Sequence, residues 1–184
     1  MNKVKPKANT APILMGNLAS QFLDDYINER DDKPVTYKDT IKKFFASSAL
    51  EFCTCPIPAN FHEQAQAQMM NIRSFVHDIL PHNIQAFDKH NTLLEASFIC
   101  EQLGLQGRVD MLQKDFKVLV EQKSGKRDEY NRRHKEDHFI QMMLYQGVLM
   151  YNFGRKTEDL QTFLLYSKSV SYTHLRAHET SLHL

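Results

Sequence analysis

The spacing of apolar residues changes after about residue 80 of this 184-residue chain, and that change limits the folds it can adopt. Through the first 80 or so residues, apolar side chains recur at the three- and four-residue intervals of amphipathic helices. Three stretches show this pattern: 13–29, 37–52 and 60–79. Pro81 is expected to end the third helix, because proline lacks a backbone N–H and its ring clashes with the preceding turn.

Beyond Pro81 the pattern shortens to the apolar runs that are typical of strands. These runs lie at 84–87, 93–99, 106–112 and 116–123, followed by an amphipathic helix at 135–151 and another strand at 161–167. This order predicts an α/β domain: helices come first, then consecutive strands, and then one helix and a strand. The domain would have a mixed central sheet flanked by helices, and an N-terminal helical segment.

The two ends of the chain differ from its middle. Residues 1–10 are expected to be a flexible basic arm, 11–58 the N-terminal helical segment and 59–169 the core that contains the sheet. The stretch VSYTHLRAHET at 170–180 resembles a translated transposase sequencing adapter. We therefore expect 170–184 to be a non-native tail outside the fold, and the natural chain to continue beyond residue 169.

Composition narrows the function classes. With 42% hydrophobic and 24% charged residues, the chain is neither disordered nor collagen-like. It has no apolar run of about 18 residues for a membrane span and no signal sequence. Three cysteines, an odd number without a disulfide framework, favour a cytoplasmic location. Because the net charge is only +1, any nucleic acid must be bound by a local basic patch.

Two acidic residues and a lysine carry the most informative pattern. Asp110 lies in one predicted strand, and Glu121 and Lys123 lie two residues apart in the next, so the latter two share a face. Carboxylates that converge from adjacent strands suit Mg²⁺ or Mn²⁺, and a neighbouring lysine can orient water or stabilise phosphoryl charge. Exposed charges alternating along an edge strand are the structural alternative.

Other polar residues point to a cleft beside these three. His138, Gln141 and Tyr145 share one face of the 135–151 helix, where polar groups need partners. His62 lies in the first turn of the third helix. A basic lip between strand and helix can hold phosphates, although a solvated charged loop explains it as well. The basic lip consists of Lys123, Lys126, Arg127, Arg132, Arg133 and Lys135.

These motifs occur in the order of a known family. A helix with His62-Glu63 is followed by GLxGxxD ending at Asp110, ExKSGK from Glu121, and QxxxY formed by Gln141 and Tyr145. From about residue 61 to 167, the chain resembles PD-(D/E)XK nucleases of the RecB-like group. It is most similar to the nuclease domain of the eukaryotic-type replication helicase–nuclease and to the CRISPR-associated four-cysteine exonuclease.

The resemblance implies a restriction-endonuclease-like fold and assigns roles. Asp110, Glu121, the backbone carbonyl of Gln122 and His62 would bind the metal, and Lys123 would position the attacking water. Gln141 and Tyr145 would contact DNA, with Glu95 and His138 as supporting residues. A structural hydrogen bond is the alternative for His62, and core packing is the alternative for Tyr145.

The cysteines depart from the family pattern. Several relatives hold an iron–sulfur cluster, with one cysteine well upstream of the helix histidine and three after the QxxxY helix. Here Cys53 and Cys55 lie just before His62, too close together for a C-x-x-C pair, and no cysteine follows Tyr145. We expect no cluster in this chain, and we expect its cysteines, including Cys100, to pack as small apolar side chains.

The function that these features predict is a Mg²⁺-dependent deoxyribonuclease domain. It would hydrolyse phosphodiester bonds of single-stranded or flap DNA, as part of a helicase–nuclease in DNA repair or replication. The chain has no GxxxxGK[ST] loop, so its helicase motor is expected in the missing C-terminal part. Two alternatives stay open: a non-catalytic DNA-binding module of a helicase complex, and a CRISPR spacer-processing exonuclease.

Overall fold

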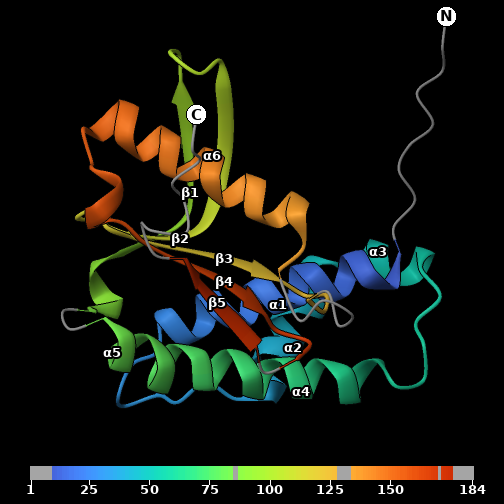
Figure 1. Ribbon diagram of the computed structural model, residues 1–184. Coiled ribbons are helices and arrows are strands. Elements are labelled where there is room, and N and C mark those ends of the chain that lie inside the picture. The colour runs from blue at the N-terminus through green and yellow to red at the C-terminus, as the bar shows by residue number, and fades with distance from the viewer. Residues whose placement is uncertain (1–9, 85–86, 128–133, 170, 176–184) are drawn as a thin grey trace, which may run out of the picture.

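A computed structural model describes residues 10–84, 87–127, 134–169 and 171–175 of the chain. Within them, five strands form one mixed sheet in the order β1-β2-β3-β4-β5 (Figure 1). The strands are β1 Thr92–Cys100, β2 Leu105–Gln113, β3 Val118–Lys123, β4 Gln161–Tyr166 and β5 Ser171–Leu175. Only β3 and β4 run parallel among these neighbours, and the other pairs are antiparallel.

Helices cover both faces of this sheet, which confirms the predicted α/β architecture. α6 lies across one face, and α1 and α4 lie on the other (Figure 1). The helical elements are α1 Ala11–Ile27, α2 Tyr37–Ser47, α3 Ala49–Thr54, α4 Phe61–Ser74, the π-helical turn Phe75–Ile79, α5 Leu80–Asn83 and α6 Glu136–Phe153, with 3-10 turns at Lys89–Asn91 and Thr157–Asp159.

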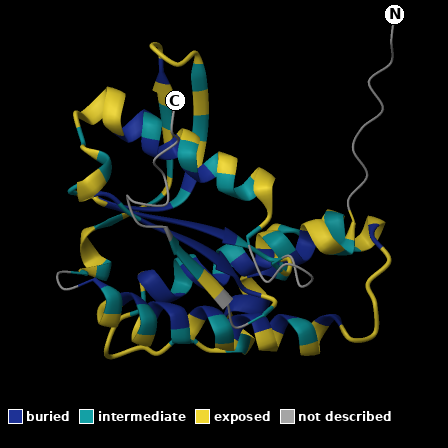
Figure 2. Ribbon diagram, viewed as in Figure 1, coloured by how far each residue is buried: buried dark blue, intermediate teal, exposed yellow. Residues whose placement is uncertain are grey.

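Strand β3 separates two hydrophobic cores. Val118 and Val120 pack with α1 and α4 in one core, which we call the α1/α4 core. Leu119 packs with α6 residues such as Met142 in the other, the α6 core. This alternation follows from the two-residue period of a strand. Figure 2 shows that the central strands are buried while the far end of the β1–β2 hairpin is more exposed. Both faces of β3 are therefore fixed by packing.

The β1–β2 hairpin bends at the level of Glu95. Glu95 has a φ of 50°, in the left-handed region that residues with a Cβ rarely adopt. Before the bend Leu94 and Met111 pack in the α1/α4 core, whereas after it Ala96 and Val109 pack in the α6 core. Residues two apart in a regular strand would face the same side. The bend turns the distal hairpin out of the sheet, so that it crosses α6 and projects beyond it (Figure 1).

Two details of the predicted elements are wrong. Pro81 does not end its helix, because a π turn precedes it: the Leu80 N–H donates to the Phe75 carbonyl five residues back. A π turn is wider than an α turn, which relieves the ring clash that normally stops a helix. The strand predicted at 84–87 is absent at Ile84 and Phe87, which instead form a turn, and residues 85 and 86 lie outside the described residues.

The cysteines follow the packing prediction only in part. Cys55 and Cys100 are buried, but Cys53 is exposed at the end of the short helix α3, so the prediction is wrong for that residue. Over the residues that the structure describes, no helix has the length and apolar character needed to cross a membrane.

The expectation that nothing after residue 169 joins the fold is also wrong. Ser171–Leu175 forms β5 and pairs antiparallel with β4. The rings of Tyr172 and His174 lie against Phe163, with centroid distances of 6.4 and 4.3 Å. Alternating aromatic residues and an otherwise unpaired edge of β4 are sufficient for a strand to form, whatever the origin of the segment. The resemblance to an adapter concerns that origin and stays a prediction.

Deleting 170–184 should lower Tm, because it exposes Phe163 and the edge of β4. The two lost ring contacts are worth about 0.5–1.5 kcal/mol each, so Tm should fall by roughly 4–8 °C. The control deletes only 176–184, keeps β5, and should leave Tm unchanged. Equal Tm values for all three chains in thermal unfolding followed by circular dichroism would contradict a structural role for β5.

Candidate active site

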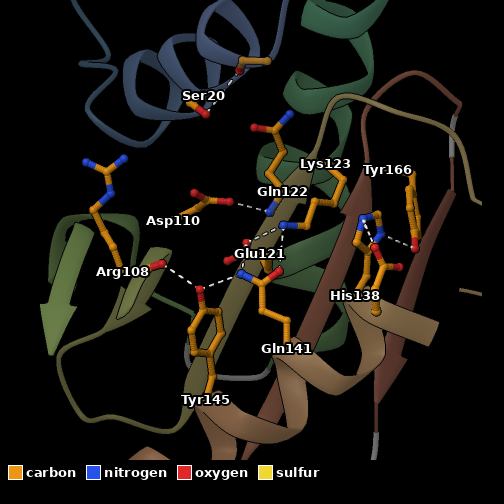
Figure 3. Close-up of polar contacts among 12 residues, drawn as sticks. Ser20, Arg108, Asp110, Glu121, Gln122, Lys123, His138, Gln141, Tyr145 and Tyr166 are labelled. Atoms are coloured by element: carbon orange, nitrogen blue, oxygen red, sulfur yellow. Dashed lines mark hydrogen bonds and ion pairs between the residues drawn. The ribbon is translucent and has the colours of Figure 1, made fainter. Parts of the chain in front are cut away.

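The register of the sheet brings Asp110 and Glu121 together. Strands β2 and β3 pair Leu112 with Leu119 and Met111 with Val120, and one further step places Asp110 across from Glu121. Opposed residues of antiparallel strands share a face. Here the hydrogen bond between the two strands is made by a side chain and not by a backbone carbonyl: Asp110 Oδ2 accepts a hydrogen bond of 2.6 Å from the Gln122 N–H (Figure 3). The two carboxylates therefore meet where the strands separate.

Glu121 is the buried acid of this site, with 4% of its surface exposed. Its Oε1 accepts from Lys123 Nζ at 2.8 Å and from Gln141 Nε2 at 2.9 Å. Its Oε2 is buried and has no hydrogen-bond partner within the described part of the chain. Burial, and then the negative charge of Asp110, raise the pKa of Glu121 to about 7. One carboxylate oxygen is thus available to a further ligand.

Lys123 closes a three-residue network with Glu121 and Gln141. Its Nζ donates 2.8 Å hydrogen bonds to Glu121 Oε1 and to Gln141 Oε1. The side chain is only 23% exposed, so the ammonium is held beside the carboxylate (Figure 3). Asp110 is tied to the same network electrostatically: burial raises the pKa of its carboxyl, while the Gln122 N–H and the Lys123 charge oppose that rise.

Helix α6 positions Gln141 through Tyr145, one turn further along. Gln141 Nε2 donates to the Tyr145 hydroxyl at 2.7 Å, and that hydroxyl donates to the Arg108 carbonyl at 2.8 Å. Gly107 makes this approach possible, because a Cβ there would lie 2.9 Å from Phe98 and 3.3 Å from Tyr145. Burial raises the pKa of Tyr145, which keeps its hydroxyl proton available for donation. The second glycine of the GLxG motif, Gly107, is thus required for the packing of Phe98 and Tyr145.

The contacts of Tyr145 in the structure correspond to the packing alternative. The residue is 8% exposed and its ring packs in the α6 core, edge-on to Phe98. Both hydrogen bonds of its hydroxyl are made within the protein, and they hold Gln141 and β2 in place. DNA contact by Gln141 and by Tyr145 stays a prediction.

The start of α6 is fixed to the end of β4. His138 Nδ1 lies 3.0 Å from the Tyr166 hydroxyl, which also accepts from the Lys135 N–H at 3.0 Å. Tyr166 is the strand neighbour of Lys123. Burial lowers the pKa of His138, which favours a neutral imidazole. His138 thus supports the site by anchoring the helix that carries Gln141.

The opposite face of β3 is anchored to α4. Gln122 Nε2 donates to Ser167 Oγ at 2.8 Å, and Ser167 Oγ donates to Gln68 Oε1 at 2.7 Å. Asn71 donates to the Ser167 carbonyl at 2.8 Å. The end of β3 is therefore held from both faces, which fixes the backbone that carries Glu121 and Lys123.

His62 is not joined to the carboxylates by any contact that the structure describes. It is exposed in the first turn of α4, its Nδ1 lies 2.8 Å from the Tyr37 hydroxyl, and its ring contacts Phe45 and Phe61. These contacts correspond to the structural alternative for this residue. Its role as a metal ligand stays a prediction.

The basic lip is described only in part. Lys126 is exposed and Arg127 is half-buried, whereas Arg132 and Arg133 lie outside the described residues. Glu95 pairs with Arg108 at 3.2 Å on the outer face of the hairpin. By the register of β1 with β2, Glu95 also lies opposite Asp110.

The sequence analysis missed one acidic residue, Asp24 of α1. Burial, together with the charges of Glu95, Asp25 and Asp110, raises the pKa of Asp24 to about 6. The negative charges of β1 and β2, on Glu95 and Asp110, therefore also act on Asp24. The available signal is a stripe of small and polar residues four apart along α1: Gly16, Ser20 and Asp24, flanked by buried apolar residues.

Comparison with known proteins agrees with this geometry. The model of the PD-(D/E)XK nuclease superfamily matches residues 7–181, so the chain belongs to that superfamily, whose members are generally hydrolytic nucleases. The match extends beyond 61–167, through the N-terminal helices and β5. No curated protein and no solved structure matches the chain.

The donor set fits a hard divalent cation. Within the described ranges, no group of three or more His, Cys, Asp or Glu residues is arranged to hold a metal ion. Asp110 and Glu121 nevertheless supply two carboxylates whose charges repel, one with a buried oxygen that lacks a partner. An oxygen-binding cation such as Mg²⁺ or Mn²⁺ satisfies that oxygen and offsets the repulsion.

The pKa of Glu121 predicts a pH-dependent stability without metal. Because the pKa in the folded protein, about 7, exceeds the ordinary glutamate value of 4.5, the folded protein binds more protons than the unfolded chain between these two pH values. Its stability therefore falls as pH rises through about 7. Glu121→Gln should remove that loss and raise Tm at pH 8, with little effect at pH 5, in thermal unfolding with EDTA. Glu158→Gln, at an exposed acid, should follow the parent, and an identical pH slope for Glu121→Gln would refute this prediction.

Proposed function

We propose that this protein is a metal-dependent deoxyribonuclease that hydrolyses phosphodiester bonds of single-stranded or flap DNA. The observation that carries the proposal is the hydrogen-bond network of Glu121, Lys123 and Gln141, with the Asp110 carboxylate bonded to the Gln122 N–H next to it, at the point where β2 and β3 separate. Superfamily membership supports a nuclease. The preference for DNA, and for single strands or flaps, comes from the resemblance to helicase-associated relatives.

Asp110, Glu121 and the backbone carbonyl of Gln122 would hold the cation, which we propose is Mg²⁺ or Mn²⁺. When bound, such an ion supplies Lewis acidity and lowers the pKa of bound water. Glu121 must be ionised to act as a ligand, and its pKa of about 7 makes that ionisation depend on pH. Affinity for the cation is therefore expected to rise as pH increases through neutrality.

Lys123 supplies a fixed positive charge next to the ligands. Its Nζ has two hydrogen-bond acceptors, Glu121 and Gln141, so its position is set before substrate arrives. A preorganised cation is most useful where negative charge develops on a phosphoryl oxygen, because no reorganisation is needed at that moment. Gln141 orients both the lysine and the carboxylate, and Tyr145 orients Gln141.

The setting of the domain is a separate part of the proposal. We propose that it acts in DNA repair or replication within a longer chain that carries a helicase motor, as the resemblance implies. Reading the uninterrupted gene beyond the codon for residue 169 tests this. A helicase motor downstream is the expected result, and an open reading frame that ends without one would contradict the association while leaving the nuclease proposal intact.

Cleavage and binding should separate in variants of the site. Asp110→Ala removes a metal carboxylate, and Lys123→Ala removes the fixed charge. Each should reduce cleavage of labelled single-stranded DNA in Mg²⁺ or Mn²⁺ by about 100- to 1,000-fold, the usual cost of losing one electrostatic stabiliser. Binding measured by fluorescence anisotropy should change little, because Lys126 and Arg127 retain the phosphate attraction.

The controls are Asp32→Ala and Lys42→Ala, which remove exposed residues of the same types outside the site. Both should cleave and bind like the parent. A parent that binds DNA but cleaves nothing with any divalent ion would favour the alternative, a non-catalytic DNA-binding module. Full activity of Asp110→Ala would contradict the assigned site.

A further inference from the structure

A pocket lies where the N-terminus of α1 meets the turn after β3. Its volume is about 300 Å³. Residues from four parts of the chain line it, among them Pro12, Gln68, Ser124, Gly125, Lys126 and Lys168. The turn that carries Ser124 and Gly125 follows Lys123 directly, so the pocket adjoins the proposed active site along the chain. None of the described lining residues is acidic.

The first turn of α1 contributes a positive helix end that no described side chain caps. α1 is 17 residues long, its first turn contains no acidic side chain, and the side chain of Thr10 makes no capping hydrogen bond. The free N–H groups and the helix dipole at such an end attract anions. This helix lies against the turn after β3: a Cβ at Gly16 would be 3.4 Å from Ser124 Oγ, an ordinary van der Waals distance.

Two lysines from separate parts of the chain add positive charge to the pocket. Lys126 follows β3 and Lys168 follows β4, and both are exposed at the pocket. The ends of two parallel strands therefore bring their cations to the same place. The described lining of the pocket thus contains two lysines and a helix N-terminus but no acidic residue, so its described charges are all positive.

The side-chain amide of Gln68 independently indicates that the pocket takes a ligand with hydrogen-bond acceptors. It is 1% exposed and lines the pocket. Its Oε1 accepts from Ser167, while its Nε2, which can only donate, is buried without a hydrogen-bond partner among the residues that the structure describes. Buried donors without partners are rare and costly. An anion with several oxygen atoms would satisfy this donor.

We propose that this pocket binds a phosphate group of the nucleic acid strand that enters the active site. The identity of the strand rests on the proposed function, whereas the affinity for phosphate rests on the pocket alone. Lys126 is three residues beyond Lys123, a reach of at most about 11 Å along the chain. The phosphate held here therefore belongs near the attacked one, either as a terminal monoester or as an internal diester.

Binding without cleavage tests the proposal. The full 184-residue chain in EDTA is titrated with inorganic phosphate at constant ionic strength, and the amide signals of Ala11, Ile13 and Gly125 are followed by NMR. These signals should shift saturably in the parent. Lys168→Gln and Lys126→Gln should each weaken the effect by about tenfold, the loss of one charge-assisted contact. Lys156→Gln, at an exposed lysine before β4, is the matched control and should behave like the parent.

Single-stranded oligonucleotides with and without a terminal phosphate then identify the source, again in EDTA. Tighter binding of the phosphorylated strand that Lys168→Gln abolishes supports a terminal monoester. Equal binding of both strands, weakened by Lys168→Gln but not by Lys156→Gln, supports an internal diester. The proposal is overturned if Lys168→Gln and Lys126→Gln match Lys156→Gln in every titration. If the parent chain binds phosphate in this way but does not cleave DNA when a divalent ion is added, the result counts against the proposed function and not against the pocket.

Discussion

A buried carboxylate next to a second carboxylate is the constraint on which this structure depends. Glu121 is 4% exposed, and burial raises its pKa to about 7. Isolated negative charge in such a place is costly, so the surrounding elements supply compensation: a lysine two residues away and an amide from α6. Tyr145 holds that amide, and Gly107 makes room for the tyrosine. Compensating the charge of this one buried acid thus involves residues of β2, β3 and α6.

The sequence was informative where a residue's partner lies at a regular spacing. Glu121 and Lys123 share a face because a strand has a period of two, and Gln141 and Tyr145 share a face because a helix has a period near four. Both pairs are bonded as those periods predict. The pairing of Asp110 with this group follows from antiparallel strands in sequence order.

Contacts between distant segments were not predictable in this way. The charge of Asp110 affects Asp24 only because α1 packs against the sheet, and the stripe of small and polar residues on α1 does not specify which strand it faces. Pro81 was misjudged because a π turn, set by tertiary packing, overrides its local preference. β5 was misjudged because the edge of β4 accepts an extended partner, a property of the sheet and not of the segment. Each error is therefore one of tertiary context.

The left-handed backbone at Glu95 makes the angle of the β1–β2 hairpin depend on a single residue. Because Glu95 lies opposite Asp110 in the register, the hairpin bends at the level of the carboxylates. Residues on one side of the bend pack in the α1/α4 core, and residues on the other side pack in the α6 core. One pair of strands can therefore both complete the acidic site and extend away from it toward solvent.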